Sequence, residues 1–493
     1  MVSITLAALP IAPGIDPGRA AVPAGTLPGE MPEGPLPGDR PAGTLPGEGD
    51  VVFCFSYLSW QAAADRGWFG TEDRLARGLL RHERVRRLLV CDLVRSLPAR
   101  VVRDVQVGMA GRAATFPAGE GARLLRPTRL RRDYPTRIGG VRRACAALDR
   151  ALGREARRMG LREPAVIVAN PLLAGFADFD WAGSVTFFAT DDWLSYEPHR
   201  RWWPAYAESF SFVRARARRV CAVSEAALAQ IAPAGGSAVL PNGVDPEEWR
   251  GALAPPPAWA RELPRPLLLY TGSLDERLDV PALLGLARAL PEASVVLVGP
   301  LLAEEHLAPL RAEPNICIRP PLPRAELIAL TRAADAGLLV HRDLPLTRAM
   351  SPLKLYEYLA AGLPVVATDL PPVRGVHPSI ELVAPAGGGA ANAQEGDPAR
   401  GDTPRGDTPR GDTPRGDTPR GDTPRGDTPR GDTPRGDTLR DDTPRGEAPH
   451  GDYVRAVRAA LTRGRAAEAS RHAFIERNSW RARHDALLDL VLA

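Results

Sequence analysis

The segment SPLKLYEYLAAGLPVVAT, residues 351–368, carries the strongest candidate chemistry in the sequence. Pro352 suits an early helical position, because its missing N–H would be unpaired there, so the amides of Leu353 and Lys354 fall at the positive end of a predicted helix. A diphosphate binds well at such a helix start. Glu357 lies one turn further on the same side, where its carboxylate can accept hydrogen bonds from vicinal hydroxyls such as those of a ribose.

Lys354 is the only lysine among the 63 basic residues. The arginine excess, in a chain with 51 Pro and 47 Gly, indicates GC-biased coding and says little about the fold. A compact ammonium group fits beside a phosphate in a tight helix start where a planar guanidinium does not, which favours a specific role for Lys354. The alternative is a solvated ion pair between Lys354 and Glu357 within the helix, which would contribute little.

A second candidate loop, TGSLDERLD at residues 271–279, follows an apolar run. Gly272 and Ser273 would let the backbone approach a ligand, and Arg277 would reach an anion near a helix that begins at about Val280, with Asp279 as its N-cap. An ordinary strand-to-helix turn is the alternative. The sequence contains no G-x-G-x-x-G and no Walker pattern, which argues against NAD enzymes and P-loop NTPases.

Short apolar runs alternate with segments of helical period in two successive sets, which indicates buried parallel strands in two doubly wound Rossmann-like α/β domains. The first set is 51–56, 88–92, 165–170, 185–190, 220–224 and 238–242; the second is 267–272, 294–299, 316–319, 336–341, 365–368 and 380–384. Ligands of such sheets bind beyond the carboxyl ends of the strands, where both candidate loops fall.

Composition shifts along the chain predict six segments. They are a disordered leader (1–50), an N-terminal domain (51–253), a proline-rich linker (254–266), a C-terminal domain (267–385), a disordered insertion (386–450) and C-terminal helices (451–493). The insertion contains nine tandem pentads of the GDTPR type at 401–445, each with both charge signs and almost no apolar surface, and all except GDTLR (436–440) with a Pro. Such units cannot offset the entropy of ordering, so we expect an expanded surface loop.

The formal net charge of the chain is +4, yet residues 123–162 alone hold 13 Arg and three acids. A predicted helix at 138–160 places an apolar stripe toward the core and an arginine face outward, which is a candidate surface for anionic lipid or a lipid-diphosphate acceptor. The five cysteines are scattered without metal-ligand spacing and predict buried free thiols in a reducing compartment. The patch lacks interleaved aromatic residues, so nucleic acid is not an expected partner.

Several motifs together resemble the GT-B glycosyltransferases of the family 4 or "group 1" type. They are TGSLDERLD, SPLKLYEYLAAGLPVVAT and the segment SEAALAQIAP to VLPNGVDPEEW at 224–249. VTFFATDDWLSY (185–196) and NSWRAR (478–483) resemble a bacterial subgroup that builds surface polysaccharides.

The resemblance implies transfer of a sugar from a nucleotide-diphospho-sugar to a hydroxyl acceptor, a carbohydrate or lipid-linked group, with retention and without a metal or further cofactor. The C-terminal domain would hold the donor and the N-terminal domain the acceptor. Donor-binding residues implied by position are Gly272, Ser273, Arg277, Ser351, Leu353, Lys354 and Glu357. Lys354 would also stabilise the departing diphosphate. Asp191 and Asp192 would face the sugar or the acceptor hydroxyl; the alternative is a helix N-cap and a solvated acid.

Two positions depart from the family pattern. Ala349 stands where many family members carry a second glutamate, and Phe188 where the subgroup commonly has an aspartate. A catalytically inactive GT-B module that binds sugar nucleotides or acts as a scaffold, or a GT-B nucleotide-sugar epimerase, therefore stays open. No apolar run is long enough to span a membrane, so a cytoplasmic enzyme, peripheral at the inner face of the plasma membrane, is expected.

Overall fold

The structure is a computed structural model whose described residues are 47–109, 114–117, 119, 121–130, 133–251, 254–385 and 451–493. All of them fall in one compact unit. The predicted disorder of residues 1–46 and 386–450 lies outside this part of the chain. The predicted end of the leader at residue 50 is wrong, because Gly49 and Asp50 already belong to the first strand. In that strand the Asp50 carboxylate pairs with Arg86 Nη2 at 2.8 Å.

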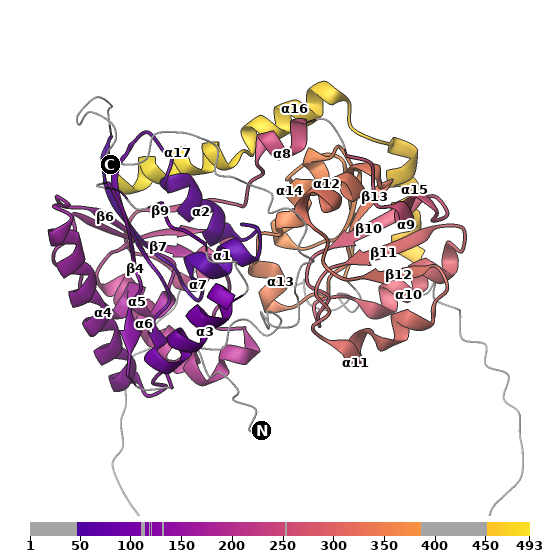
Figure 1. Cartoon of the computed structure of the whole chain (residues 1–493). Helices are drawn as coiled ribbons and strands as arrows, with labels where there is room; N and C mark the ends of the chain where they lie inside the picture. The colour runs from indigo at the N-terminus through magenta and orange to yellow at the C-terminus, as the bar shows by residue number, and fades with distance from the viewer. Residues whose placement is uncertain are drawn as a thin grey trace, which may run out of the picture. The chain divides into compact units, whose positions relative to one another are not determined.

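The first half of the described chain, drawn in indigo to magenta in Figure 1, contains a parallel sheet. Its strand order is β4-β2-β1-β6-β7-β8-β9. Its strands are β1 (Gly49–Cys54), β2 (Val85–Cys91), β4 (Ala122–Leu125), β6 (Ala165–Val168), β7 (Ser184–Ala189), β8 (Arg219–Ala222) and β9 (Ser237–Val239). A small two-stranded sheet pairs β3 (Arg95–Ser96) with β5 (Thr128–Arg129).

The second half forms a parallel sheet in the order β12-β11-β10-β13-β14-β15. Its strands are β10 (Leu267–Thr271), β11 (Ser294–Val298), β12 (Ile316–Arg319), β13 (Ala336–Leu339), β14 (Val365–Thr368) and β15 (Ile380–Val383). The strand order reverses between β1 and β6 in one sheet and between β10 and β13 in the other, so both are doubly wound. The predicted fold class is confirmed, with β3, β4 and β5 as additional strands.

Helices of the first half are α1 (Trp60–Asp65), α2 (Thr71–Leu79), α3 (Leu97–Met109), α4 (Ile138–Arg158), α5 (Pro171–Phe176), the 3-10 helix η1 (Glu197–Trp202), α6 (Trp203–Ala215), α7 (Glu225–Ile231) and α8 (Pro246–Arg250). Those that follow are α9 (Ala258–Arg261), α10 (Val280–Ala289), α11 (Glu304–Leu307), η2 (Ala308–Ala312), α12 (Arg324–Ala333), α13 (Pro345–Ala349), α14 (Leu353–Ala360), η3 (Pro371–Val373), α15 (Gly451–Arg463), α16 (Glu468–Arg477) and α17 (Trp480–Val491).

Both faces of each sheet are buried, which explains why the strands are continuous apolar runs. In β1, Val51 and Phe53 pack with α1, α2 and α17, whereas Val52 and Cys54 pack with α4, α5, α6 and α7. In β10, alternate residues likewise face α10 and α15 on one side and α12, α14 and α16 on the other. The cores are therefore sheet interiors between two helical layers.

The last helices cross between the two sheets. The yellow segment in Figure 1 begins with α15, which packs on β14 and β15, and ends with α17, which packs on α2, β6 and β7. Trp480 and Leu487 of α17 are buried in the core of the first sheet. The C-terminus of the chain therefore completes the N-terminal half of the fold.

Two further predictions concern helix α4 and the cysteines. Val141, Cys145 and Leu152 of α4 are buried in the core, while its arginines, including Arg150 and Arg154, are exposed. All five cysteines are free, and four of them are buried. Among the described residues, no helix combines the length and apolarity needed to cross a bilayer.

Candidate active site

The loop after β10 and the start of α14 meet at Gly272 and Lys354. Gly272 has φ +123°, and a Cβ added there would lie 2.8 Å from Lys354 Cε and 2.9 Å from its Nζ. A side chain at position 272 would thus displace the ammonium group and strain the backbone. The sequence requires glycine here because the lysine side chain lies over this backbone.

Tyr270, at the end of β10, holds the Lys354 ammonium group. Lys354 Nζ donates to Tyr270 Oη at 2.7 Å and lies 4.0 Å from the centre of the ring. The hydroxyl of Tyr270 donates in turn to the carbonyl of Ser273 at 3.2 Å, and His341 Nε2 lies 3.2 Å from Tyr270 Oη. Burial lowers the pKa of Lys354 to about 7, and the nearby Arg277 contributes to the shift.

Arg277 is fixed by an acid two residues before it in the chain. Its Nε and Nη2 contact the Asp275 carboxylate at 2.9 and 2.6 Å, and its Nη1 lies 4.0 Å from the sulfur of Met350. Burial alone would lower the pKa of Arg277, but the ion pair with Asp275 outweighs it and raises the pKa above its usual value. Arg277 is therefore a permanent, preoriented cation close to Lys354.

The two adjacent aspartates of the first half have different environments. Asp192 is buried, and its Oδ1 accepts from the amides of Leu194 and Ser195 at 3.0 and 3.1 Å and from Gln230 Nε2. Asp191 instead faces Arg277: burial raises the pKa of Asp191 to about 6, and Arg277 opposes that shift. Asp192 fixes the turn through its hydrogen bonds, whereas Asp191 accepts from the amide of Asp192 at 3.2 Å and interacts electrostatically with Arg277.

Helix α14 begins at Leu353, and Pro352 is its N-cap in an extended conformation. The prediction that Pro352 is already helical was wrong by one position, but the amides of Leu353 and Lys354 do occupy the first turn. Ser351 lies before this turn and contacts Asn242, whose backbone N donates to Ser351 Oγ at 3.1 Å and whose side-chain amide donates to Ser351 O at 2.6 Å. Residues from both halves of the chain therefore fix the entry to α14.

Glu357 pairs with Arg324 of α12 rather than with Lys354. Arg324 Nη1 contacts Glu357 Oε1 at 2.5 Å, and its Nη2 contacts Glu248 Oε2 at 2.6 Å. Glu248 also accepts from Arg74 Nη2 at 2.8 Å, so a chain of ion pairs runs from Glu357 to α2. The intrahelical ion pair considered from sequence is not formed.

The two family departures lie in the interior. Ala349, the last residue of α13, is buried, and its carbonyl accepts a hydrogen bond from Ser224 Oγ. Ser224 also caps α7, since its Oγ accepts from the amide of Ala227 at 3.1 Å. Phe188 is buried in the core of the first sheet. Neither position contacts the cations around Gly272.

The architecture is similar to several solved structures. One is an alpha,alpha-trehalose-phosphate synthase (UDP-forming) from Burkholderia vietnamiensis, with a TM-score of 0.57 and 14% identity over 90% of this chain and 98% of that one. Another, described as trehalose-6-phosphate from E. coli bound with UDP-2-fluoro glucose, has a TM-score of 0.55 and 12% identity over 90% and 99%. The chain has the GT-B glycosyltransferase fold. The predicted GT-B architecture is thereby confirmed.

Two sequence matches accompany the GT-B fold. The chain is 31% identical over 107 residues to the proposed teichuronic acid biosynthesis glycosyltransferase TuaH of Bacillus subtilis (strain 168). That match covers 21% of this chain and 27% of the relative. Residues 416–440 match five copies of the GETHR pentapeptide repeat, which confirms a tandem repeat in that range.

Three partners of this GT-B site were missed from sequence: Tyr270, Asp275 and Arg324. Tyr270 stands two residues before Gly272, within an apolar run that has the pattern of an ordinary buried strand. Asp275 lies within the TGSLDERLD loop, where the spacing of an acid two residues before Arg277 was an available signal. Arg324 carried no local signal, because its partners Glu248 and Glu357 are distant in sequence.

Proposed function

We propose that this protein transfers a sugar from a nucleotide-diphospho-sugar to a hydroxyl acceptor. The observation that carries the proposal is that Lys354 Nζ, from the first turn of α14, lies over the bare backbone of Gly272 and close enough to Arg277 to feel its charge. Two cations and a helix start together suit a diphosphate, the leaving group of such a reaction. Similarity to a glycosyltransferase over part of the chain supports the same chemistry.

In this proposal different residues bind different parts of the donor. The backbone of Gly272 and Ser273 approaches the phosphates, Lys354, Arg277 and the Leu353 amide meet their charge, and Ser351 fixes the entry to the helix. Glu357 uses one carboxylate oxygen for Arg324 and presents the other to the ribose hydroxyls. Because charge develops on the departing diphosphate, preoriented cations lower the barrier more than they strengthen ground-state binding.

The acceptor side of the proposal centres on Asp191. A carboxyl group whose pKa is about 6 is mostly ionised at neutral pH and can accept the proton of a sugar or acceptor hydroxyl. We further propose hexosyl-type transfer with retention, without metal or added cofactor, in surface-polysaccharide or glycolipid synthesis at the cytoplasmic face of the membrane. The motif resemblance supports these finer points, and the partial likeness to TuaH, named for teichuronic acid biosynthesis, supports the role in polysaccharide synthesis.

Incubation of the full chain with a panel of radiolabelled UDP-, GDP- and dTDP-sugars tests the proposal. We expect slow hydrolysis of one donor, transfer to an added acceptor, and the same anomer in donor and product by proton NMR. Lys354→Ala should lower kcat by about a hundredfold or more, since it removes a charge that acts on the leaving group. Unchanged turnover in Lys354→Ala would refute the diphosphate assignment.

A second candidate is a module that binds a sugar nucleotide without turnover. The buried methyl group of Ala349 favours it, because a carboxylate that many family members offer to the sugar is missing at that position. The same panel separates the two candidates: tight binding of a nucleotide sugar without hydrolysis, transfer or epimerisation would support the inactive module.

A further inference from the structure

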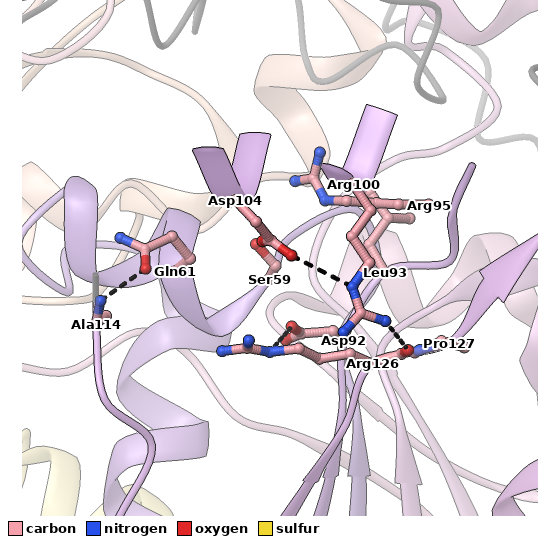
Figure 2. A pocket seen from close by; sticks show the side chains of 10 residues that line it. All are labelled: Ser59, Gln61, Asp92, Leu93, Arg95, Arg100, Asp104, Ala114, Arg126 and Pro127. Atoms are coloured by element: carbon pink, nitrogen blue, oxygen red, sulfur yellow. Dashed lines mark hydrogen bonds and ion pairs between the residues drawn. The ribbon is translucent and has the colours of Figure 1, made fainter. Parts of the chain in front are cut away.

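A second site lies in the first half of the fold, beyond the carboxyl ends of β2 and β4. It is a cavity of about 260 Å³ (Figure 2). Three guanidinium groups, those of Arg95, Arg100 and Arg126, line it together with the carboxylates of Asp92 and Asp104. In doubly wound sheets this edge is where ligands bind. None of the donor-site residues lines this cavity.

The carboxylate of Asp92 forms the floor of the cavity and is only 8% exposed. Its Oδ1 accepts from the amide of Trp60 at 2.7 Å, whereas its Oδ2 lies 3.8 Å from Arg126 Nε, beyond hydrogen-bond length. Burial raises the pKa of Asp92 to about 6. An anion that entered beside it would raise this pKa further, so the carboxyl group would take up a proton instead of repelling the ligand.

The contacts of Arg100 inside the cavity are long. Its Nη1 donates to the carbonyl of Arg126 at 3.2 Å, and its Nε lies 3.5 Å from Asp104 Oδ2 (Figure 2). Arg100 and Arg126 are thus each paired with a carboxylate at 3.5 and 3.8 Å, longer than a charged hydrogen bond, so both guanidinium groups can turn toward an anion in the cavity. Guanidinium groups in such positions suit a phosphate, which accepts two parallel N–H bonds from each.

Helix α3, which carries Arg100 and Asp104, exposes an apolar surface beside the cavity. Leu97, Val101 and Val105, spaced four residues apart, form one row along the helix, and the latter two are each 54% exposed. Val102 and, next to β5, Leu130 are exposed as well. Five of the six large apolar side chains that are exposed within the described residues thus belong to α3 and the adjoining β5 segment.

The apolar row of α3 lies next to the row that lines the cavity, Arg100 and Asp104. At about 100° per residue, Asp104 and Leu97 fall roughly 20° apart around the helix axis, so a ligand can contact both rows at once. A molecule that fits this surface has an anionic head and a hydrocarbon tail. A free sugar phosphate would leave the apolar row of α3 exposed to water, and an uncharged lipid would offer the arginines no anion to bind.

We propose that the cavity and the apolar row of α3 together bind a lipid phosphate, with its phosphate or diphosphate group among Arg95, Arg100 and Arg126 and its hydrocarbon chain along Leu97, Val101 and Val105. Identification of this lipid as the sugar acceptor rests on the proposed function; the binding itself does not. The surface is distinct from the arginine face of α4, where the sequence placed a lipid contact.

Vesicle flotation with the full chain tests the site. Three vesicle types serve as probes: phosphatidylcholine alone, phosphatidylcholine with phosphatidic acid, and phosphatidylcholine with phosphatidylserine at equal surface charge. We expect the strongest binding to phosphatidic acid. Arg100→Gln/Arg126→Gln and, separately, Val101→Asp/Val105→Asp should each weaken that binding on the order of tenfold or more. Melting curves equal to wild type would show that each variant is folded.

The matched control is Arg150→Gln/Arg154→Gln, which removes an exposed arginine pair from α4 and should bind like wild type. Equal binding to all three vesicle types, an equal loss in the control, or no loss in Arg100→Gln/Arg126→Gln would overturn the proposal. So would a dimer that Val101→Asp/Val105→Asp dissociates, since a second copy would then cover α3. Lys354→Ala should bind vesicles normally, so loss of glycosyl transfer and loss of lipid binding remain separable.

Discussion

The proton on Lys354 decides how this site responds to pH. Burial and Arg277 lower its pKa to about 7, so above neutrality much of the free protein carries an uncharged amine. A bound diphosphate favours the charged form and raises that pKa again. Binding of a nucleoside diphosphate should therefore take up a proton at pH 8, and its affinity should fall as pH rises through the pKa of the complex.

Because the sequence has one lysine, this pKa can be measured directly. Reductive methylation with ¹³C-formaldehyde labels Lys354 Nζ and the terminal amine, and Lys354→Arg removes only the first resonance. We expect the Lys354 resonance to titrate near pH 7 in the free protein and at a higher pH with a nucleoside diphosphate. Titration at the usual lysine pKa would contradict the environment described for Tyr270 and Arg277.

Asp191 and Asp192 allow a paired test of function against architecture. Asp191→Asn should lower kcat by about a hundredfold or more and leave thermal stability unchanged or higher, because the folded state already disfavours the Asp191 charge. Asp192→Asn should cost about 1–2 kcal/mol of stability, because the Asp192 carboxylate accepts from Leu194 N, Ser195 N and Gln230. Calorimetry and steady-state kinetics on both variants check this, and a reversed pattern would exchange the two roles.

At the scale of the helices and strands, the orientation of Glu357 depends on Arg324. This arginine joins α12 to Glu357 of α14 and to Glu248 of α8, and it is only 9% exposed. Arg324→Met should lower the free energy of unfolding by about 3 kcal/mol, because it leaves the half-buried Glu357 without a cation. It also leaves Glu248 with Arg74 as its one remaining ion-pair partner among the described residues. Arg324→Lys should keep most stability but weaken discrimination between a nucleoside diphosphate and its 2′-deoxy form, because Lys cannot contact both carboxylates as a fork. Equal discrimination would show that Glu357 does not need Arg324.

The same ion pairs make stability depend on acid pH. Burial alone would raise the pKa of Glu248, but Arg324 and Arg74 outweigh it and lower the pKa to about 2. Glu248 therefore stabilises the fold above its unfolded pKa of about 4.3, and this contribution is lost as pH falls from there toward 2. Urea titrations at several pH values should show this loss in wild type and a smaller one in Glu248→Gln.

Strands with buried neighbours on both faces were predictable, because each is a continuous apolar run, and all twelve expected runs became strands. β4 was missed because ARLL lies in an arginine-rich segment and becomes a strand only by pairing with β2. The cavity beside helix α3 was not predictable, because Asp92, Arg100 and Arg126 are separated in sequence and meet only in the folded chain. In the candidate site, one loop and one helix of the sequence point to Gly272, Lys354 and Glu357, and their role in donor binding stays a prediction. Their partners Tyr270 and Arg324 depend on long-range pairing that no local pattern contains.

At the scale of the whole molecule, we expect deletion of the repeats to change stability and activity little and loss of the last helix, α17, to lower stability strongly. The insertion follows β15 and precedes α15, and these two elements pack together within the described structure, with Tyr453 Oη 2.7 Å from Thr368 Oγ1 of β14. Deletion of 401–445 should thus leave melting temperature and activity nearly unaltered, since loop-closure entropy changes slowly with length.

Removal of 480–493 is the matched comparison, because α17 buries Trp480, Leu487 and Leu488 in the first sheet's core. Its loss should expose that core and unfold the N-terminal half, since burial of these side chains contributes several kcal/mol. Differential scanning calorimetry and tryptophan fluorescence on the two deletions distinguish the segments. A large loss of stability or activity on deletion of the repeats would instead give them a structural or binding role, because a passive loop has no contacts to lose.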